Sequence, residues 1–151
     1  MKIRNAVVED VPIVVGLDRS SPTAAHWEER RYQELFETAG NAPERLVLVS
    51  EKAPGAPIGF LVARRVAAEW ELENIVVAPA SRGLGIGKRL LDALVARARE
   101  AGGEAVFLEV RESNAAARKL YEKAGFGQTG RRKSYYCDPV EDAILYRKAL
   151  E

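Results

Sequence analysis

The sequence has few residues that bind metals or form disulfides. Among its 151 residues it has one cysteine, Cys137, and one histidine, His26. A lone cysteine cannot form an internal disulfide, which is typical of a chain that works in a reducing cytoplasm. A structural zinc site needs about four ligands, mostly cysteine and histidine. We therefore expect a cytoplasmic protein with no metal.

Long apolar runs and an excess of one charge are also missing. No apolar run approaches the ~20 residues of a membrane-spanning helix, and the first ten residues, MKIRNAVVED, lack the pattern of a signal peptide. The 23 basic and 22 acidic residues give a formal charge of +1, whereas a nucleic-acid-binding domain needs a concentrated basic face. We expect no binding to membranes or nucleic acids.

The composition is that of an ordinary globular protein, with 47% apolar and 30% charged residues. Its length fits one domain, residues 1–151. Hydrophobic periodicity and turn residues predict helices at 9–20, 24–40, 84–101 and 113–126. They predict strands at 2–7, 45–51, 58–68, 70–79, 102–112, 126–138 and 142–150. This order indicates an α/β (α+β) fold, with one mixed sheet and helices on both of its faces.

Side chains at the predicted helix ends suit capping. Asp10 is a candidate N-cap for the first helix, with Pro12 in the first turn. Ser113 or Asn114 is expected to cap the last helix, and Gly125 follows its end.

A glycine-rich loop precedes the third helix, and two phosphate-binding motifs do not fit it. A Walker loop needs four residues between its glycines, but Gly83 and Gly87 are separated by three, and Lys88 is followed by Arg89. A dinucleotide-binding loop needs a third glycine at the position of Lys88, and it follows the first strand of its fold. Here the loop follows the fourth predicted strand, so three strands come before the one that leads into it.

The remaining pattern is Arg82-x-x-Gly85-x-Gly87 between a strand and a helix. Backbone amides of residues 84–88 can point at a pyrophosphate, and the helix dipole adds to the attraction. Arg82 and Lys88 add positive charge at the rim. The alternative is a turn whose glycines only begin the helix.

This loop resembles the acetyl-CoA-binding signature, Q/R-x-x-G-x-G/A, of the Gcn5-related N-acetyltransferase (GNAT) superfamily. The blocks NIVVAP, RGLGIGKRLL, LEVRESNAAARKLYEKAGF, RRKSYY and EDAILYRKAL resemble the bacterial ribosomal-protein-alanine N-acetyltransferases. They cover about residues 70–150, and the first half of the chain matches only loosely. The resemblance implies a mostly antiparallel seven-stranded sheet with four helices. It also implies an acetyl-CoA-dependent N-acetyltransferase whose acceptor is the N-terminal alanine of a small-subunit ribosomal protein. We expect a monomer or a weak homodimer.

The same resemblance implies which residues bind the coenzyme: the loop holds the pyrophosphate, and the main chain of the preceding strand holds the pantetheine arm. The implied residues are Ile75, Val76, Val77, Arg82, Gly83, Leu84, Gly85, Ile86, Gly87, Lys88, Asn114 and Tyr121. A buried apolar strand would by itself account for Ile75, Val76 and Val77. Helix capping would by itself account for Asn114.

Acetyl transfer to an amine needs a base for the amine's proton and an acid for the leaving thiolate. Glu109 is the candidate base, because glutamate is depleted in strands and rarely buried without a partner. An ion pair with Arg111 is the alternative. Tyr121 is the candidate acid, since a phenol with a pKa near 10 can protonate a thiolate. The alternative is a core tyrosine with a hydrogen-bonded hydroxyl. The resemblance assigns both catalytic roles to these positions.

Several acceptor-site questions stay open in the sequence. Glu71 and Glu73, on the strand before the loop, are rival bases. We expect an acceptor site of Glu73, Asn74, Tyr135 and Tyr136. The resemblance implies that both tyrosines bracket the incoming amino terminus and that Glu141 and Asp142 orient their hairpin, whereas in the alanine-specific branch the positions of Glu71 and Glu73 are not acidic bases. The basic residues before the tyrosines could also form a solvated strand. A small-molecule or lysine acetyltransferase and a non-catalytic acyl-CoA sensor remain alternative functions.

Overall fold

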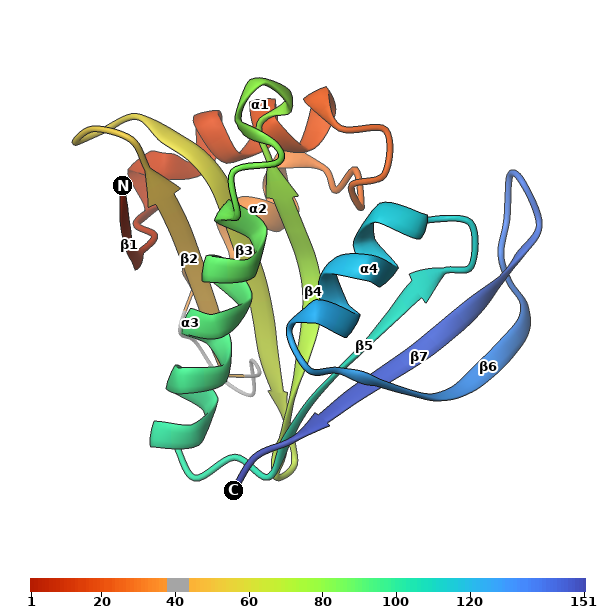
Figure 1. Cartoon of the computed structure of the whole chain (residues 1–151). Helices are drawn as coiled ribbons and strands as arrows, with labels where there is room; N and C mark the ends of the chain where they lie inside the picture. The colour runs from red at the N-terminus through yellow and green to blue at the C-terminus, as the bar shows by residue number, and fades with distance from the viewer. Residues whose placement is uncertain (38–43) are drawn as a thin grey trace.

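The computed structural model describes residues 1–37 and 44–151 (Figure 1). Its strands are β1 (Lys2–Asn5), β2 (Arg45–Glu51), β3 (Pro57–Val66), β4 (Glu69–Val77), β5 (Ala105–Arg111), β6 (Gly127–Tyr136) and β7 (Glu141–Ala149). Its α-helices are α1 (Val11–Ser20), α2 (Glu29–Glu34), α3 (Ile86–Glu100) and α4 (Ala115–Lys123). Two 3₁₀ turns, Val8–Asp10 and Pro79–Ser81, precede α1 and follow β4. No helix of the described residues is long and apolar enough to cross a membrane.

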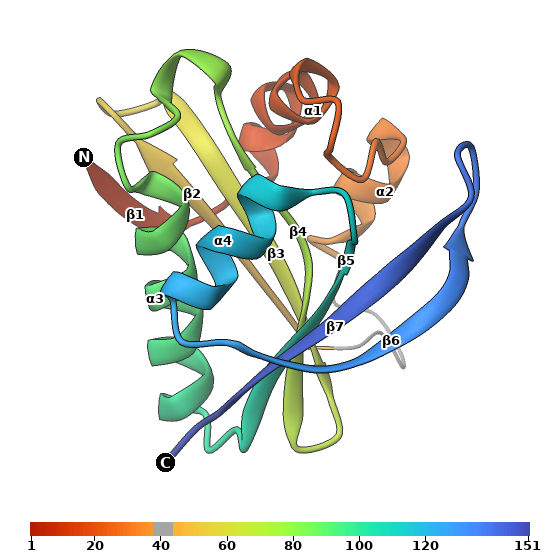
Figure 2. The same ribbon diagram turned by 45° about the vertical axis from the view of Figure 1, so that its right-hand side comes forward.

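The strands form one seven-stranded sheet in the order β1-β2-β3-β4-β5-β7-β6. Only the β4–β5 pair is parallel, which confirms the expected mixed and mostly antiparallel sheet. That pair is short, because residues 69–71 of β4 meet residues 105–107 of β5 and the pairing then stops. Beyond it the two strands separate, as both views show (Figures 1 and 2). The sheet is therefore split at its centre.

Helices cover both faces, as expected. α3 and α4 pack on one face, and the apolar stripe of α3 there is Leu90, Leu91, Leu94, Val95 and Ala98. α1 and α2 cover the other face around Tyr32 and Phe60. Each face thus has its own buried core, and β3 and β4 contribute to both.

A bulge in β4 changes which residues face each core. Val62 of β3 lies opposite Asn74, and its neighbour Ala63 lies opposite Leu72, so Glu73 is the extra residue. Leu72 packs in the core under α3, whereas Asn74 reaches the α2 side. Because side chains alternate along a strand, only an inserted residue can produce this switch.

Two local predictions were wrong. The helix expected at 24–40 is found only at Glu29–Glu34, and its last three residues lie outside the described part of the chain. Residues 24–28 instead form a loop in which the Trp27 amide donates to the Asp18 carboxylate, at 3.1 Å. His26 lies in that loop with a φ of 55°, and not on a helix surface.

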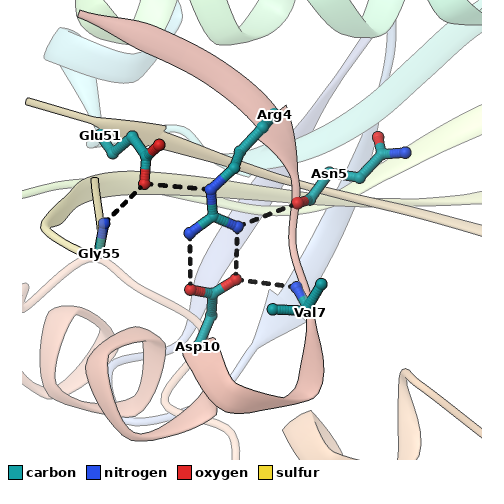
Figure 3. A network of polar contacts seen from close by, with 6 residues as sticks. All are labelled: Arg4, Asn5, Val7, Asp10, Glu51 and Gly55. Atoms are coloured by element: carbon teal, nitrogen blue, oxygen red, sulfur yellow. Dashed lines mark hydrogen bonds and ion pairs between the residues drawn. The ribbon is translucent and has the colours of Figure 1, made fainter. Parts of the chain in front are cut away.

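Asp10 does not cap α1 through its side chain. Its two oxygens accept from the guanidinium of Arg4, at 2.8 and 2.9 Å, and one also accepts from the Val7 amide (Figure 3). Arg4 also donates to Glu51, at 3.1 Å. Because the Asp10 carboxylate is bonded to Arg4, which also bonds to Glu51, Arg4 joins β1 and β2 to the start of α1. Asn114 does cap α4, since its Oδ1 accepts from the Ala117 amide, at 3.2 Å.

Candidate active site

A cleft of about 990 Å³ lies where β4 and β5 separate. This volume falls at the upper end of the range for small-molecule sites. The expected site residues that line it are Glu73, Asn74, Ile75, Val76, Val77, Arg82, Gly83, Gly85, Ile86, Gly87, Lys88, Glu109, Asn114, Tyr121 and Tyr136. Leu84 and Tyr135 lie outside this lining; Leu84 is 72% exposed on the loop. The split in the sheet thus brings together residues from β4, the glycine loop, β5, α4 and β6.

The glycine loop presents free backbone donors to one side of the cleft. Gly85 adopts a left-handed conformation, with φ 78°, directly before α3, and this favours glycine. Among the described residues, the amides of residues 83–88 have no protein acceptor. Gly87 lies so near α4 that a Cβ would be 3.1 Å from Leu120 Cδ2. The loop can therefore receive an anionic group at the positive end of α3.

The two basic residues of the loop are already partly engaged. Arg82 donates to the Ser21 hydroxyl, at 3.1 Å, and to the Val77 carbonyl oxygen, at 3.3 Å. Lys88 pairs with Asp92 one turn along α3, at 2.8 Å. Arg82 thus joins the loop to the end of β4 and to the end of α1, while both residues keep positive charge beside the free amides.

Tyr121 projects from α4 and is buried, with its ring packed against Tyr146 and Phe126. Among the described residues its hydroxyl has no hydrogen-bond partner, whereas the Tyr146 hydroxyl donates to Glu122, at 2.7 Å. Burial raises the pKa of Tyr121. Tyr121 therefore keeps its proton at neutral pH and lines the cleft, while its neighbour Tyr146 is a fully bonded core tyrosine.

Glu109 borders the cleft from β5. Its strand neighbours Leu108 and Val110 pack under α3 and α4, so the Glu109 side chain faces the opposite side of the sheet. Its Oε1 lies 2.9 Å from Nε of Arg132 on β6. Interaction with this carboxylate raises the pKa of Tyr135.

The alternative reading of Glu109, an ion pair with Arg111, is wrong, because Glu109 pairs with Arg132. Arg111 donates to Glu141, at 3.2 Å, and to the carbonyl oxygens of Cys137 and Pro139. Partners on a neighbouring strand lie nearer than a residue two positions along the same strand, whose side chain is about 7 Å away.

Glu73 is held more tightly than Glu109. Arg45 donates to its carboxylate, and Arg31 and Arg64 lie 3.8 and 4.0 Å from it. The side chain is 8% exposed, compared with 18% for Glu109. Burial outweighs the arginines and raises the pKa of Glu73. The bulge points this carboxylate toward α2, into a cluster of basic side chains.

The β6–β7 hairpin closes the same side of the cleft. Glu141 accepts from the Ser113 amide, at 2.6 Å, and Asp142 accepts from the Ser134 amide, at 2.8 Å. These bonds hold the hairpin as expected. The Arg111 guanidinium lies 4.4 Å from the centre of the Tyr136 ring, and burial raises the pKa of Tyr136 to about 12.

Comparison with known proteins identifies the family to which this chain belongs. The sequence matches the acetyltransferase (GNAT) family over residues 14–126, which is most of the chain. The chain belongs to the GNAT acetyltransferase family. It is 34% identical to a putative [ribosomal protein bS18]-alanine N-acetyltransferase of Bacillus subtilis, over 95% of this chain and 91% of that protein.

Two further proteins support this membership. The [ribosomal protein bS18]-alanine N-acetyltransferase of Haemophilus influenzae is 46% identical over 58% of this chain, and the match spans 62% of that protein. The crystal structure of the ribosomal-protein-S18-alanine N-acetyltransferase from Escherichia coli superposes with a TM-score of 0.81 at 29% identity, covering 99% of this chain and 94% of that chain.

GNAT acetyltransferases use acetyl-CoA, and the cleft fits such a molecule. The free amides of residues 83–88 suit its pyrophosphate. The unpaired edge of β4 beyond Glu71 offers main-chain groups to an extended amide-bearing arm. Within the described residues no cluster of three or more potential metal ligands is found.

Some lining residues were missed by the sequence analysis. The loop after α1 contributes Ser21, Thr23 and Ala24, and the sequence placed part of this segment in a helix. The one available signal was Asp18, an acidic residue among apolar neighbours in α1, whose buried carboxylate anchors that loop.

Proposed function

We propose that this chain is an acetyl-CoA-dependent N-acetyltransferase that acts on the α-amine of a protein amino terminus. The N-terminal alanine of a small-subunit ribosomal protein is the proposed acceptor, and the cytoplasm is the proposed location. The proposal rests chiefly on one observation: Glu109 and Tyr121 line one cleft from opposite faces of the sheet. The acceptor is supported by the relatives described above, which are named as alanine N-acetyltransferases of ribosomal protein bS18 or S18. We further propose that residues 1–151 form one catalytic domain.

The two faces suit two different reactants. On the α3 side, the loop amides and β4 would hold acetyl-CoA, which supplies an activated thioester carbonyl. On the other side, Tyr136 and the loop after α1 would receive the peptide. Because both reach the split between β4 and β5, the transfer is direct, in a ternary complex. Cys137 is exposed and is not part of the cleft lining, so it is not an acyl carrier.

Each catalytic side chain has one proton to move. The α-amine has an ordinary pKa of about 8, so it arrives largely protonated near neutral pH. Glu109 takes that proton, directly or through a water, and leaves a lone pair that attacks the carbonyl carbon. As the carbon–sulfur bond breaks, Tyr121 gives its proton to the sulfur. The raised pKa of Tyr121 keeps this proton available. The acetylated nitrogen then loses its second proton, which returns through water to the Tyr121 oxygen, and Glu109 releases the first proton to solvent.

The test is intact-mass analysis of synthetic peptides incubated with enzyme and acetyl-CoA. The panel varies the first residue and includes an amino-blocked peptide that contains lysine. Gain of one acetyl group only on free alanine-starting peptides supports the proposal. Gain on the blocked peptide would move the target to lysine and refute the α-amine assignment.

A second candidate is a lysine or small-molecule acetyltransferase with Glu73 as the base. Glu73 lines the cleft, and its raised pKa is a common property of general bases. Acetylation of polyamines or aminoglycosides, and not of peptides, would favour this candidate.

A further inference from the structure

A buried polar chain that the mechanism above does not use runs from α1 to the cleft. It starts at Asp18, which is fully buried near the end of α1. Its Oδ2 accepts from the Trp27 amide, at 3.1 Å, and from the Tyr32 hydroxyl. Its Oδ1 has no partner among the described residues.

The direction of these hydrogen bonds fixes the next residue. The Tyr32 hydroxyl has one proton, and it donates that proton to Asp18. Its oxygen can then only accept, and Nδ2 of Asn74 donates to it, at 2.8 Å. Burial and the Asp18 carboxylate raise the pKa of Tyr32, so the proton stays on the phenol. The Asn74 amide is therefore held with its NH₂ group toward Tyr32 and its Oδ1 directed away.

That oxygen belongs to a residue of the cleft. Asn74 lines the cleft from β4, on the edge that faces β5 and Glu109. Its Oδ1 has no hydrogen-bond partner in the described part of the chain, although the residue is only 7% exposed. Unlike Oδ1 of Asp18, this oxygen is not fully buried, so it is open to the cleft and can accept a hydrogen bond from a ligand.

We propose that Oδ1 of Asn74 accepts a hydrogen bond from the acceptor amine, and that Tyr32 and Asp18 are positioning residues that orient it. This inference rests on the proposed function. After Glu109 has taken one proton, a primary amine keeps two N–H groups. With one of them bonded to Asn74, the amine cannot rotate freely, so its lone pair stays directed at the thioester.

The test compares Asn74→Val and Tyr32→Phe with wild type on an alanine-starting peptide. Valine suits a strand opposite Val62, and phenylalanine keeps the ring contacts of Tyr32. The control is Ser50→Ala, which removes a fully buried hydroxyl on β2, outside the cleft lining. Each reaction is measured as kcat/KM for the peptide, with the Kd of acetyl-CoA and the Tm alongside.

We expect Asn74→Val to lower kcat/KM for the peptide about 10- to 100-fold, the effect of losing a hydrogen bond to a charged or developing charged group. We expect Tyr32→Phe to lower it about tenfold although Tyr32 does not line the cleft. The Kd of acetyl-CoA should stay within about twofold in both. The double variant should lose no more than Asn74→Val alone, because Tyr32 acts through Asn74.

Wild-type kcat/KM in both variants, or losses that add up in the double variant, would overturn the inference. So would a parallel loss of acetyl-CoA affinity, which indicates general damage to the cleft. If Asn74→Val does not fold, Asn74→Ser replaces it with the same expectations. If wild type acetylates lysine or small amines and no α-amine, the proposed function fails, while the same variants on that amine still test Asn74.

Discussion

The guanidinium of Arg132 lies 2.9 Å from the carboxylate of Glu109. Arg132 is on β6, and its side chain extends from the exposed side of that strand to Glu109 on β5. The pair keeps Glu109 at the split in the sheet and on the face opposite α3 and α4. Glu73, by contrast, lies among three arginines. Because their surroundings differ, we expect substitutions of Glu109 and Glu73 to have different effects on kcat.

Glu109→Gln should lower kcat about 100-fold or more, because a positioned base contributes roughly 10²–10⁴ in rate. The affinity for acetyl-CoA should stay near that of wild type, which isothermal titration calorimetry can measure. Glu69→Gln, at a partly exposed carboxylate on β4 paired with Arg147, is the matched control. A wild-type kcat in Glu109→Gln would remove Glu109 from the mechanism.

Glu73→Gln should leave kcat within about threefold of wild type, a change of under 1 kcal/mol in the activation free energy. The reason is that Glu73 is bonded to Arg45 and lies near Arg31 and Arg64. Single-turnover kinetics with the preferred acceptor would measure this. The opposite pattern, a large loss here and none in Glu109→Gln, would make Glu73 the base.

Tyr121→Phe and Tyr146→Phe form a pair of tests on two neighbouring rings whose centres lie 6.1 Å apart. Tyr121→Phe should lower kcat about 100-fold with little change in Tm. Tyr146→Phe should instead lower the Tm, because Glu122 and Arg118 lose their hydroxyl partner. If Tyr146→Phe had the larger effect on kcat, the assignment of the acid would be wrong.

Gly87→Ala should weaken acetyl-CoA binding, since the new Cβ would meet Leu120 Cδ2 at 3.1 Å and displace α3 from α4. We expect the Kd to rise about tenfold, as measured by fluorescence or calorimetric titration. Gly16→Ala, within α1 and with nothing within 4 Å of its Cβ, should stabilise the fold by up to about 1 kcal/mol. An unchanged Kd in Gly87→Ala would show that α4 can yield without moving the loop.

Asp10→Asn should destabilise the protein by about 2 kcal/mol at pH 7, the range for a hydrogen bond between charged groups. Arg4 lowers the pKa of Asp10 below its ordinary value near 3.8. The stabilisation is therefore complete above that ordinary value and is lost as the pH falls through the lower, folded pKa. Urea titrations of both proteins should converge below about pH 4, while Glu34→Gln, at an exposed pair, changes little. A constant difference down to pH 2 would contradict this account.

The sequence predicted the succession of helices and strands along the chain well where local signals and long-range structure agree. The apolar stripe of α3 and the Asn114 cap follow from spacing and residue type alone. The pairing partner of Glu109 could not be predicted, because Arg132 is 23 positions away and only the β5-β7-β6 order brings it near.

Two other features depended equally on tertiary contacts. Residues 24–28 have helical spacing, but a buried carboxylate from α1 holds them in a loop. The bulge at Glu73 leaves no mark in the sequence, since its effect is a change of register against β3.

The exposed Leu84 was grouped with the site by its neighbours in the motif, although its side chain points to solvent.

The early end of β4–β5 pairing has a consequence for solubility. An unpaired strand edge can recruit strands from other molecules and start aggregation. Here the two additional edges lie inside a cleft partly covered by α4, where another chain has little access. The outer edges are protected differently, since β1 has four residues and β6 is interrupted by register shifts and carries Arg131, Arg132 and Lys133. The fold can thus keep main-chain hydrogen-bonding groups free for a ligand without presenting them to neighbouring copies of itself.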